Sequence, residues 1–202
     1  MFMSHGPLER EREVAIHPTD GFEAVAEAKR LTGEVRVVER RPRMDGYVWG
    51  VLRLFMAWIF MWPFLDKVFG WGYATQAGYG WIDGGSPTSG YLEFATKGPF
   101  AGLFQDLAGS AVVDWLFMLG LLGVGVALML GIGVRIGALT GAAMLTLMWL
   151  ATMLPEFNPW LDDHIVYAFI LIGLVATGAG RYIGLGGWWM RTRLVRRFRF
   201  LT

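Results

Sequence analysis

The chain has 202 residues, of which 54% are hydrophobic and only 17% are charged, and its mean hydropathy is +0.43. A water-soluble domain of this length rarely carries so much apolar sequence, so the composition is typical of a polytopic membrane protein. The absence of cysteine excludes disulfides, thiolate metal sites, Fe-S clusters with cysteine ligands and covalently attached c-type haem within this chain.

The first segment, residues 1–45, is a polar tail that carries eight of the 18 lysines and arginines. Within it, residues 19–31 have an apolar stripe at helical spacing, with Asp20 as the N-cap and Glu23 three positions later. This pattern predicts a short amphipathic helix.

Four apolar segments follow, and each approaches the roughly 20 residues that a helix needs to cross a bilayer. They show neither the polar face of a helix in a soluble protein nor the alternation of barrel strands. The sequence therefore predicts an all-α integral membrane protein, with a four-transmembrane-helix domain over residues 46–187. The segments are residues 47–65, 115–134, 136–155 and 165–180.

The positive charges indicate how these helices are oriented. Fifteen of the 18 lysines and arginines fall in the tail, at Arg135 between the second and third segments, or after the fourth segment. The other side carries only Lys67 and Lys97. By the positive-inside rule, both termini are cytoplasmic and the loop between the first two helices is extracytoplasmic. We expect a multi-pass protein of a prokaryotic inner (plasma) membrane.

Residues 188–202 form a basic segment that opens with Trp188 and Trp189. Such a run can bind nucleic acid, but its position directly after a membrane helix favours contact with anionic lipid headgroups. We therefore expect the bilayer, and no nucleic acid, as the partner of this cytoplasmic interfacial segment.

The loop between the first two helices, residues 70–110, is too long for a simple connection. It is rich in aromatic residues, among them Trp81, and in glycine, and residues 91–107 have the character of one or two short helices. We interpret it as a lid over the bundle. Glycines such as Gly137 and Gly141 allow close helix packing, which fits either a tight bundle or a groove for a flat or isoprenoid ligand.

The polar residues of the extracytoplasmic rim are the candidates for chemistry. Helix capping or headgroup contact explains each of them singly. In a small bundle, however, Lys67, Asp163 and His164 are expected to converge, and Tyr167 shares a helix face with Asp163. A histidine beside an apolar groove suits proton transfer to a quinone oxygen. Lys67, Asp163 and His164 are therefore the candidate catalytic residues.

The candidate ligand-binding residues are more widely spread. Arg53 lies within the first helix, where an arginine either extends to the membrane surface or marks a buried pair or cavity. No pair of histidines has the spacing of a haem site, and we expect no haem and no metal. The full set of candidate ligand-binding residues is Arg53, Asp66, Lys97, Trp81 and Tyr167.

Several motifs in order resemble the DoxX family of small four-helix membrane proteins, over residues 47–189. They are RL (53–54), LDKVFGWG (65–72), GGSPTSG (84–90), GPFAGLF (98–104), VDWLFMLGLLGVG (113–125), LGIGVRIGA (130–138), NPWLDDHIVYA (158–168) and AGRYIGLGGWW (179–189). The residues whose positions match the family are Arg53, Asp66, Lys67, Asp163 and His164.

The resemblance implies a redox-associated role linked to a quinone, since related proteins belong to a thiosulfate:quinone oxidoreductase or to a membrane oxidoreductase complex for thiol stress. Because the chain alone offers no obvious electron carrier, a bound cofactor or an electron-donating protein partner would then be needed. The rim has eight acids against two lysines, which disfavours a dianion such as thiosulfate. The alternative is a non-catalytic accessory or scaffold subunit of a larger membrane complex. In either case we expect a protein partner or a homo-oligomer. A transporter is disfavoured because no inverted repeat is present.

Overall fold

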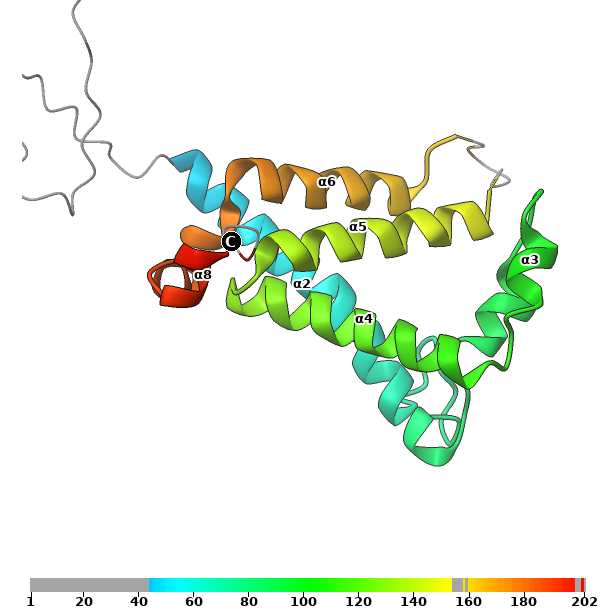
Figure 1. The fold of residues 1–202 in the computed structure, drawn as a ribbon. Coiled ribbons are helices and arrows are strands. Elements are labelled where there is room, and N and C mark those ends of the chain that lie inside the picture. Colours follow the sequence, from blue (N-terminus) through cyan, green and yellow to red (C-terminus); the bar gives the residue numbers. More distant parts are fainter. Residues whose placement is uncertain (1–43, 154–157, 159, 199–200, 202) are drawn as a thin grey trace, which may run out of the picture. The chain divides into compact units, whose positions relative to one another are not determined.

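The computed structural model describes residues 44–153, 158, 160–198 and 201, and every regular element in these ranges is helical (Figure 1). The expectation of an all-helical protein is confirmed for this part of the chain, whereas the amphipathic helix predicted at 19–31 lies outside it. The longer helices are α2 (Met44–Phe69), α4 (Ala111–Leu130), α5 (Val134–Ala151) and α6 (Asp163–Thr177). The shorter elements are η1 (Trp81–Asp83), η2 (Tyr91–Ala95), α3 (Ala101–Gln105), η3 (Ala179–Arg181), α7 (Gly186–Trp189) and α8 (Arg193–Arg197).

The three longest helices, α2, α4 and α5, are long enough and apolar enough to cross a membrane. The predicted segments 47–65 and 136–155 overlap α2 and α5, but the segment at 115–134 is shifted, since α4 begins and ends four residues earlier. Gly131 and Gly133, with φ of 78° and 61°, form the turn between α4 and α5. Hydropathy alone does not reveal this turn because the residues around it are apolar.

The fourth predicted segment, residues 165–180, corresponds to α6, which has only 15 residues. A helix of this length extends about 22 Å, less than the roughly 30 Å of a bilayer core. Gly178 adopts a left-handed conformation with φ of 62° and ends the helix, and η3 follows directly. A fourth complete span therefore stays a prediction.

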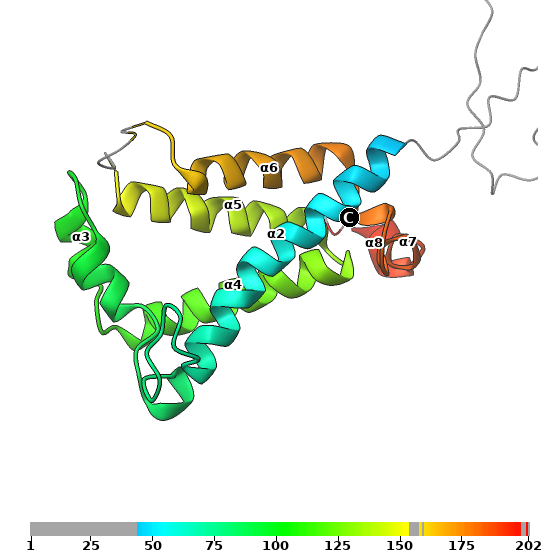
Figure 2. The ribbon, with the colours of Figure 1, turned by 180° about the vertical axis from the view of Figure 1, so that it is seen from behind.

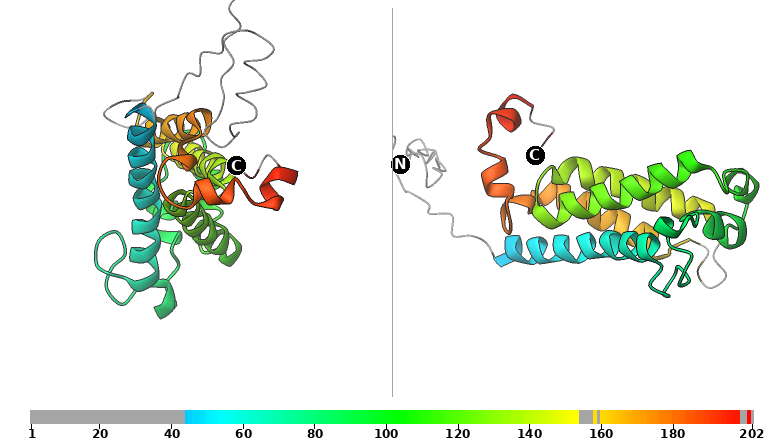
Figure 3. Two further views of the ribbon diagram at one scale, coloured as in Figure 1. Left: turned by 90° about the vertical axis from the view of Figure 1, so that its left-hand side faces the viewer. Right: turned by 90° about the horizontal axis from the view of Figure 1, so that it is seen from below.

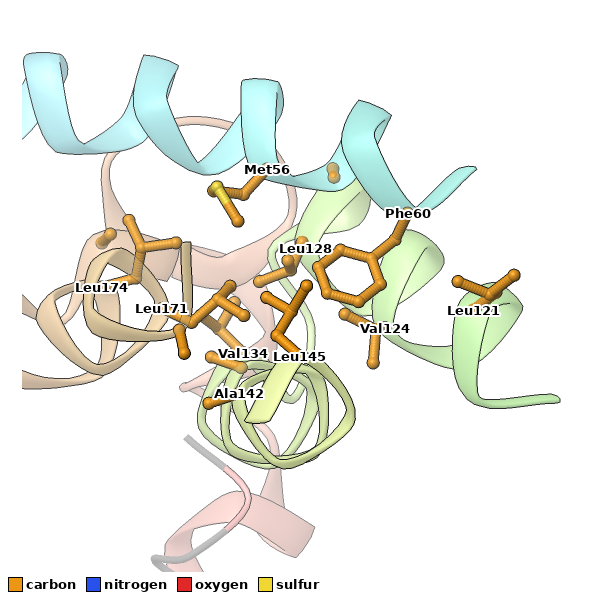
Figure 4. Close-up of a cluster of buried hydrophobic side chains, with 14 of the residues drawn as sticks. Met56, Phe60, Leu121, Val124, Leu128, Val134, Ala142, Leu145, Leu171 and Leu174 are labelled. Carbon is orange, nitrogen blue, oxygen red and sulfur yellow. The ribbon is translucent and has the colours of Figure 1, made fainter. Parts of the chain in front are cut away.

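The helices pack in two closely associated pairs, α2 with α4 and α5 with α6, joined by contacts between α4 and α5 (Figures 1 and 2). Phe60, Val124 and Leu171, from three different helices, meet in the core (Figure 4). A Cβ atom at Gly141 would lie within about 3.0 Å of these same three side chains. Glycine at this position of α5 therefore permits the close approach of its neighbours.

The outward faces of the long helices are also apolar. Large hydrophobic side chains point away from the core along every one of them, and Phe55, Leu116 and Phe169 each expose more than 60% of their surface. A water-soluble protein rarely exposes a continuous apolar surface of this extent. The bundle is thus apolar both inside and outside.

The two ends of the bundle differ in chemistry. We call one the arginine end, where α2 begins, α4 meets α5, and α6 is followed by α7 and α8 (Figure 3). We call the other the loop end, where residues 70–110 connect α2 to α4. Lys67, Asp163 and His164 lie at the loop end, and Arg135 and Arg181 lie at the arginine end.

Arg53 is fully buried near the arginine end and contacts both α4 and the chain that follows η3. Its guanidinium donates hydrogen bonds to the backbone carbonyl of Leu128, in the last turn of α4, and to that of Ile183, at 2.7 Å for the latter. A cation is favoured there because the C-terminus of a helix carries partial negative charge. Arg53 therefore ties the end of α4 to the chain that follows η3.

Candidate functional site

At the loop end, all four long helices and the loop line a partly open cavity of about 550 Å³. This volume is within the usual range for small-molecule sites. Most of the lining is hydrocarbon, and it comes from α2, α4, α5 and the loop. The apolar lining includes Ile59, Phe60 and Pro63 from α2, Val113, Leu116, Phe117 and Leu121 from α4, Met144, Leu145 and Met148 from α5, and Phe104 and Leu107 from the loop.

A few polar groups interrupt this lining. Lys67 comes from the last turn of α2, and Asp163, His164 and Tyr167 come from the first turns of α6. Tyr91 is added by η2 of the loop. The structure thus brings the three candidate catalytic residues and one candidate ligand-binding residue to a single cavity, as their expected convergence required. Their roles in chemistry stay predictions.

The start of α6 holds His164 in a defined orientation. Asp162 is the N-cap of the helix, because its Oδ1 accepts a hydrogen bond from the backbone N–H of Ile165 at 3.2 Å. Its other oxygen lies 2.7 Å from Nδ1 of His164. A carboxylate can only accept, so Nδ1 carries the proton of this bond. In the neutral ring Nε2 is then the nitrogen that is able to accept a proton.

Lys67 is half-buried at the edge of the cavity. In the ranges that the structure describes, the one ion pair within 4.0 Å is that of His164 with Asp162, so the ammonium of Lys67 has no carboxylate partner at that distance. A cation beside an apolar cavity gains from an oxygen acceptor on a bound molecule, because its own solvation is reduced there. Lys67 is therefore suited to contact a carbonyl or anionic oxygen of a ligand.

Tyr91 was not a sequence candidate. Its hydroxyl donates to the backbone carbonyl of Met148 at 3.2 Å, which connects the loop to α5. Burial raises the pKa of this hydroxyl, the charge of Asp162 acts in the same direction, and a hydrogen bond with Thr152 partly opposes them. Tyr91 therefore stays protonated near neutral pH and remains a donor.

Two buried carboxylates fix the loop over the cavity. Asp66, in α2, accepts backbone hydrogen bonds from Ala74 at 3.1 Å and Thr75 at 2.8 Å. Asp114, in α4, accepts from the hydroxyls of Ser86 at 2.9 Å and Thr88 at 2.5 Å, and also from the backbone N–H of Thr88. Because Thr88 lines the cavity, the carboxylate of Asp114 helps to hold that wall in place.

Asp66 and Asp114 therefore have partners in the loop that the sequence did not reveal. Asp66 was predicted to bind a ligand, but its carboxylate is occupied by the loop and it does not appear in the cavity lining. Asp114 lies in the first turn of α4, where a carboxylate is favoured, and it also binds the turn at 84–90. The serine and threonine of the turn at 84–90 were the signal in the sequence for a buried carboxylate partner, but nothing in the sequence identified which carboxylate.

Three other candidate ligand-binding residues also lie apart from the cavity lining. Trp81 packs edge-on against Trp115 with ring centroids 4.6 Å apart. Lys97 is exposed, and its backbone N–H donates to the carbonyl of Ala151 at 2.9 Å. Arg53 lies near the arginine end, with two carbonyls as its partners.

Asp162, Asp163 and His164 also offer three potential metal-ligand atoms within 4.8 Å of one another. One oxygen of Asp162 already caps the helix, and the other contacts His164. The start of α6, where carboxylates are favoured, therefore explains why these three side chains lie close together.

Comparison with known proteins finds no matching family model, no matching curated protein and no matching solved structure.

Proposed function

We propose that this chain is an integral membrane protein of the DoxX type whose loop-end cavity binds a quinone or a similar flat, apolar molecule. The observation that carries the proposal is the cavity itself, about 550 Å³ in volume, with hydrocarbon walls and a small polar group of residues at α6 and Lys67. Apolar pockets with a few convergent polar groups are the usual form of small-molecule sites.

The membrane setting is supported by three apolar helices of sufficient length and by their exposed apolar faces. Most of the described cations gather at the arginine end, which favours a cytoplasmic location for that end; they are Arg135, Arg181, Arg191 and the three arginines of α8. The loop end and its cavity would then face the outer side of a prokaryotic plasma membrane. The resemblance to the DoxX family supports a redox role.

The residues of the cavity fit such a ligand. A bound quinone would supply two-electron chemistry, with the electrons coming from a bound cofactor or a partner protein. The hydrocarbon walls would hold its ring and tail and exclude water. Lys67 would donate a hydrogen bond to one ring oxygen, and His164, oriented by Asp162, would exchange a proton with an oxygen through Nε2.

The proposal is tested by purifying the full chain in a mild uncharged detergent and extracting bound small molecules for mass spectrometry. We expect the wild type to retain a quinone in an amount comparable to that of the protein, and to reduce it when an electron-donating partner is supplied. Retention of detergent and phospholipid alone, together with no quinone reduction, would exclude this function.

A non-catalytic role in a larger complex is the second candidate, because aromatic side chains gather on the surface at the loop end. Trp62 contacts both Trp71 and Tyr73, with ring centroids 5.6 and 5.0 Å apart, and Tyr73 is 72% exposed. Exposed aromatic clusters are common at protein interfaces and at membrane surfaces. Replacing Trp71 and Tyr73 by alanine should release a co-purified subunit if they form an interface, and should change only lipid contacts otherwise.

A further inference from the structure

A second cavity, of about 380 Å³, lies at the arginine end, on the opposite side of the core from the loop. The first turn of α5, the last turns of α6 and the short helix α7 surround it. None of its lining residues belongs to the loop-end cavity. Whatever it binds is therefore separate from the ligand proposed above.

Two arginines lie at the rim of this second cavity. Arg135 comes from the first turn of α5, and Arg181 ends η3. Within the described ranges, no carboxylate lies within 4.0 Å of either guanidinium. Both arginines thus line the same cavity, and neither is in an ion pair with a described carboxylate.

The position of Arg181 depends on a glycine. A Cβ atom at Gly178 would lie only 2.8 Å from Nη2 of Arg181, so the guanidinium packs directly over this residue. Gly178 also adopts the left-handed conformation that ends α6. The same glycine therefore ends the helix and makes room for the arginine beside the cavity.

The start of α5 adds a third positive element. Its N-cap is Gly133, which has no side chain to accept hydrogen bonds from the first turn of this 18-residue helix. The free N–H groups and the helix dipole favour an anion at such a terminus. Val134 and Arg135, the first two residues of α5, both line the cavity, so these donors and the two guanidinium groups are close to the same space.

The remaining walls are apolar. Leu174 and Val175 of α6 line one side, and Trp189 and Met190 line another. The indole of Trp189 is held in place because its Nε1 donates to the carbonyl of Leu201 at 2.8 Å. A small anion in water would gain nothing from these walls, whereas the glycerol and the first acyl carbons of a lipid would contact them.

We propose that the second cavity binds the phosphate group of an anionic phospholipid. Arg135, Arg181 and the start of α5 would contact the phosphate, and the apolar walls would contact the glycerol and the upper acyl chain. The exposed arginines of residues 191–197 would raise the local concentration of anionic lipid around it. The shared chemistry is a phosphate ester or phosphate ion, and its source is distinguished by experiment.

The test measures binding to the full chain in uncharged detergent, by native mass spectrometry, in three titrations: phosphatidylglycerol, phosphatidylcholine and inorganic phosphate. Phosphatidylglycerol should bind with saturation and at least about tenfold more tightly than phosphatidylcholine. The double variant Arg135→Gln/Arg181→Gln should weaken that binding by about tenfold or more, because each arginine near an anionic lipid contributes measurably to its affinity.

The matched control is Arg191→Gln/Arg193→Gln, which removes the same charge from positions outside the cavity lining. It should change the affinity for phosphatidylglycerol by less than about twofold.

The variant Arg135→Lys/Arg181→Lys retains the charge and should retain most of the binding. Unchanged melting temperatures show that each variant is folded. If inorganic phosphate binds in an arginine-dependent way without any lipid preference, the ligand is a soluble phosphate compound. Equal losses in the two glutamine variants, or no saturable binding of any probe, would overturn the proposal.

Discussion

The substitution Asp114→Ala tests how the loop is held over the loop-end cavity. It removes the acceptor of three hydrogen bonds, from the hydroxyls of Ser86 and Thr88 and from the backbone N–H of Thr88. Thr88 is 5% exposed and Asp114 is 7% exposed, so water does not readily replace the lost partner. Hydrogen bonds to charged groups contribute about 1.5–3 kcal/mol each, and partial relaxation lowers the total.

We therefore expect the free energy of opening this part of the loop to fall by about 3 kcal/mol, which corresponds to roughly 100-fold faster exchange of its protected amides. Hydrogen–deuterium exchange with mass spectrometry over residues 84–96 measures this directly. The amides of Gly85, Ser89 and Leu92 report on it, since each donates a hydrogen bond within the loop.

The control is Asp106→Ala, which removes an exposed carboxylate from the same loop. It should leave the exchange rate within about twofold of the wild type, because surface substitutions away from such contacts have small effects. If Asp114→Ala exchanges no faster than Asp106→Ala over residues 84–96, then Asp114 does not hold the loop, and the account of this wall of the cavity is wrong.

Three further substitutions give distinct results. Arg53→Met should lower the free energy of unfolding by about 2–4 kcal/mol, because two backbone carbonyls lose their donor. A melting temperature in detergent equal to that of the wild type would refute this. Asp162→Ala should destabilise the protein by about 1 kcal/mol through loss of the N-cap, while Asp162→Asn keeps the cap, so equal melting temperatures for the two variants would argue against it. His164→Gln should leave quinone binding intact but slow quinone reduction by about 100-fold in the presence of the partner, and unchanged turnover would remove His164 from proton transfer.

Much of the helical framework could be predicted from hydropathy. The apolar segments located α2 and α5 closely, because a lipid-facing helix must be apolar over most of its length. The same signal misplaced α4, since the turn at Gly131 and Gly133 lies within apolar sequence. It also placed the end of α6 three residues too late, because Ala179 and Gly180, which follow the left-handed Gly178, are not polar either.

The candidate site could be predicted only in part. Lys67, Asp163 and His164 reach one cavity because helix ends in a small bundle are necessarily close together. Which side chains the loop contacts depends on the path of some forty residues, and local sequence does not determine it. For this reason the partner of Asp66, the role of Asp114 and the contribution of Tyr91 became apparent only from the structure.

The central claim, that the loop-end cavity holds an apolar ligand, is tested most directly by filling it. Val113 lines the cavity, whereas its neighbour Val112 does not and is 68% exposed on the outer face of α4. The measurement is a titration of the purified chain with a short-tailed quinone, carried out for the wild type, Val113→Trp and Val112→Trp. We predict saturable binding to the wild type and to Val112→Trp, and binding at least about tenfold weaker to Val113→Trp, because one bulky side chain displaces ligand volume. Equal affinity in all three proteins, with unchanged melting temperatures, would contradict the account.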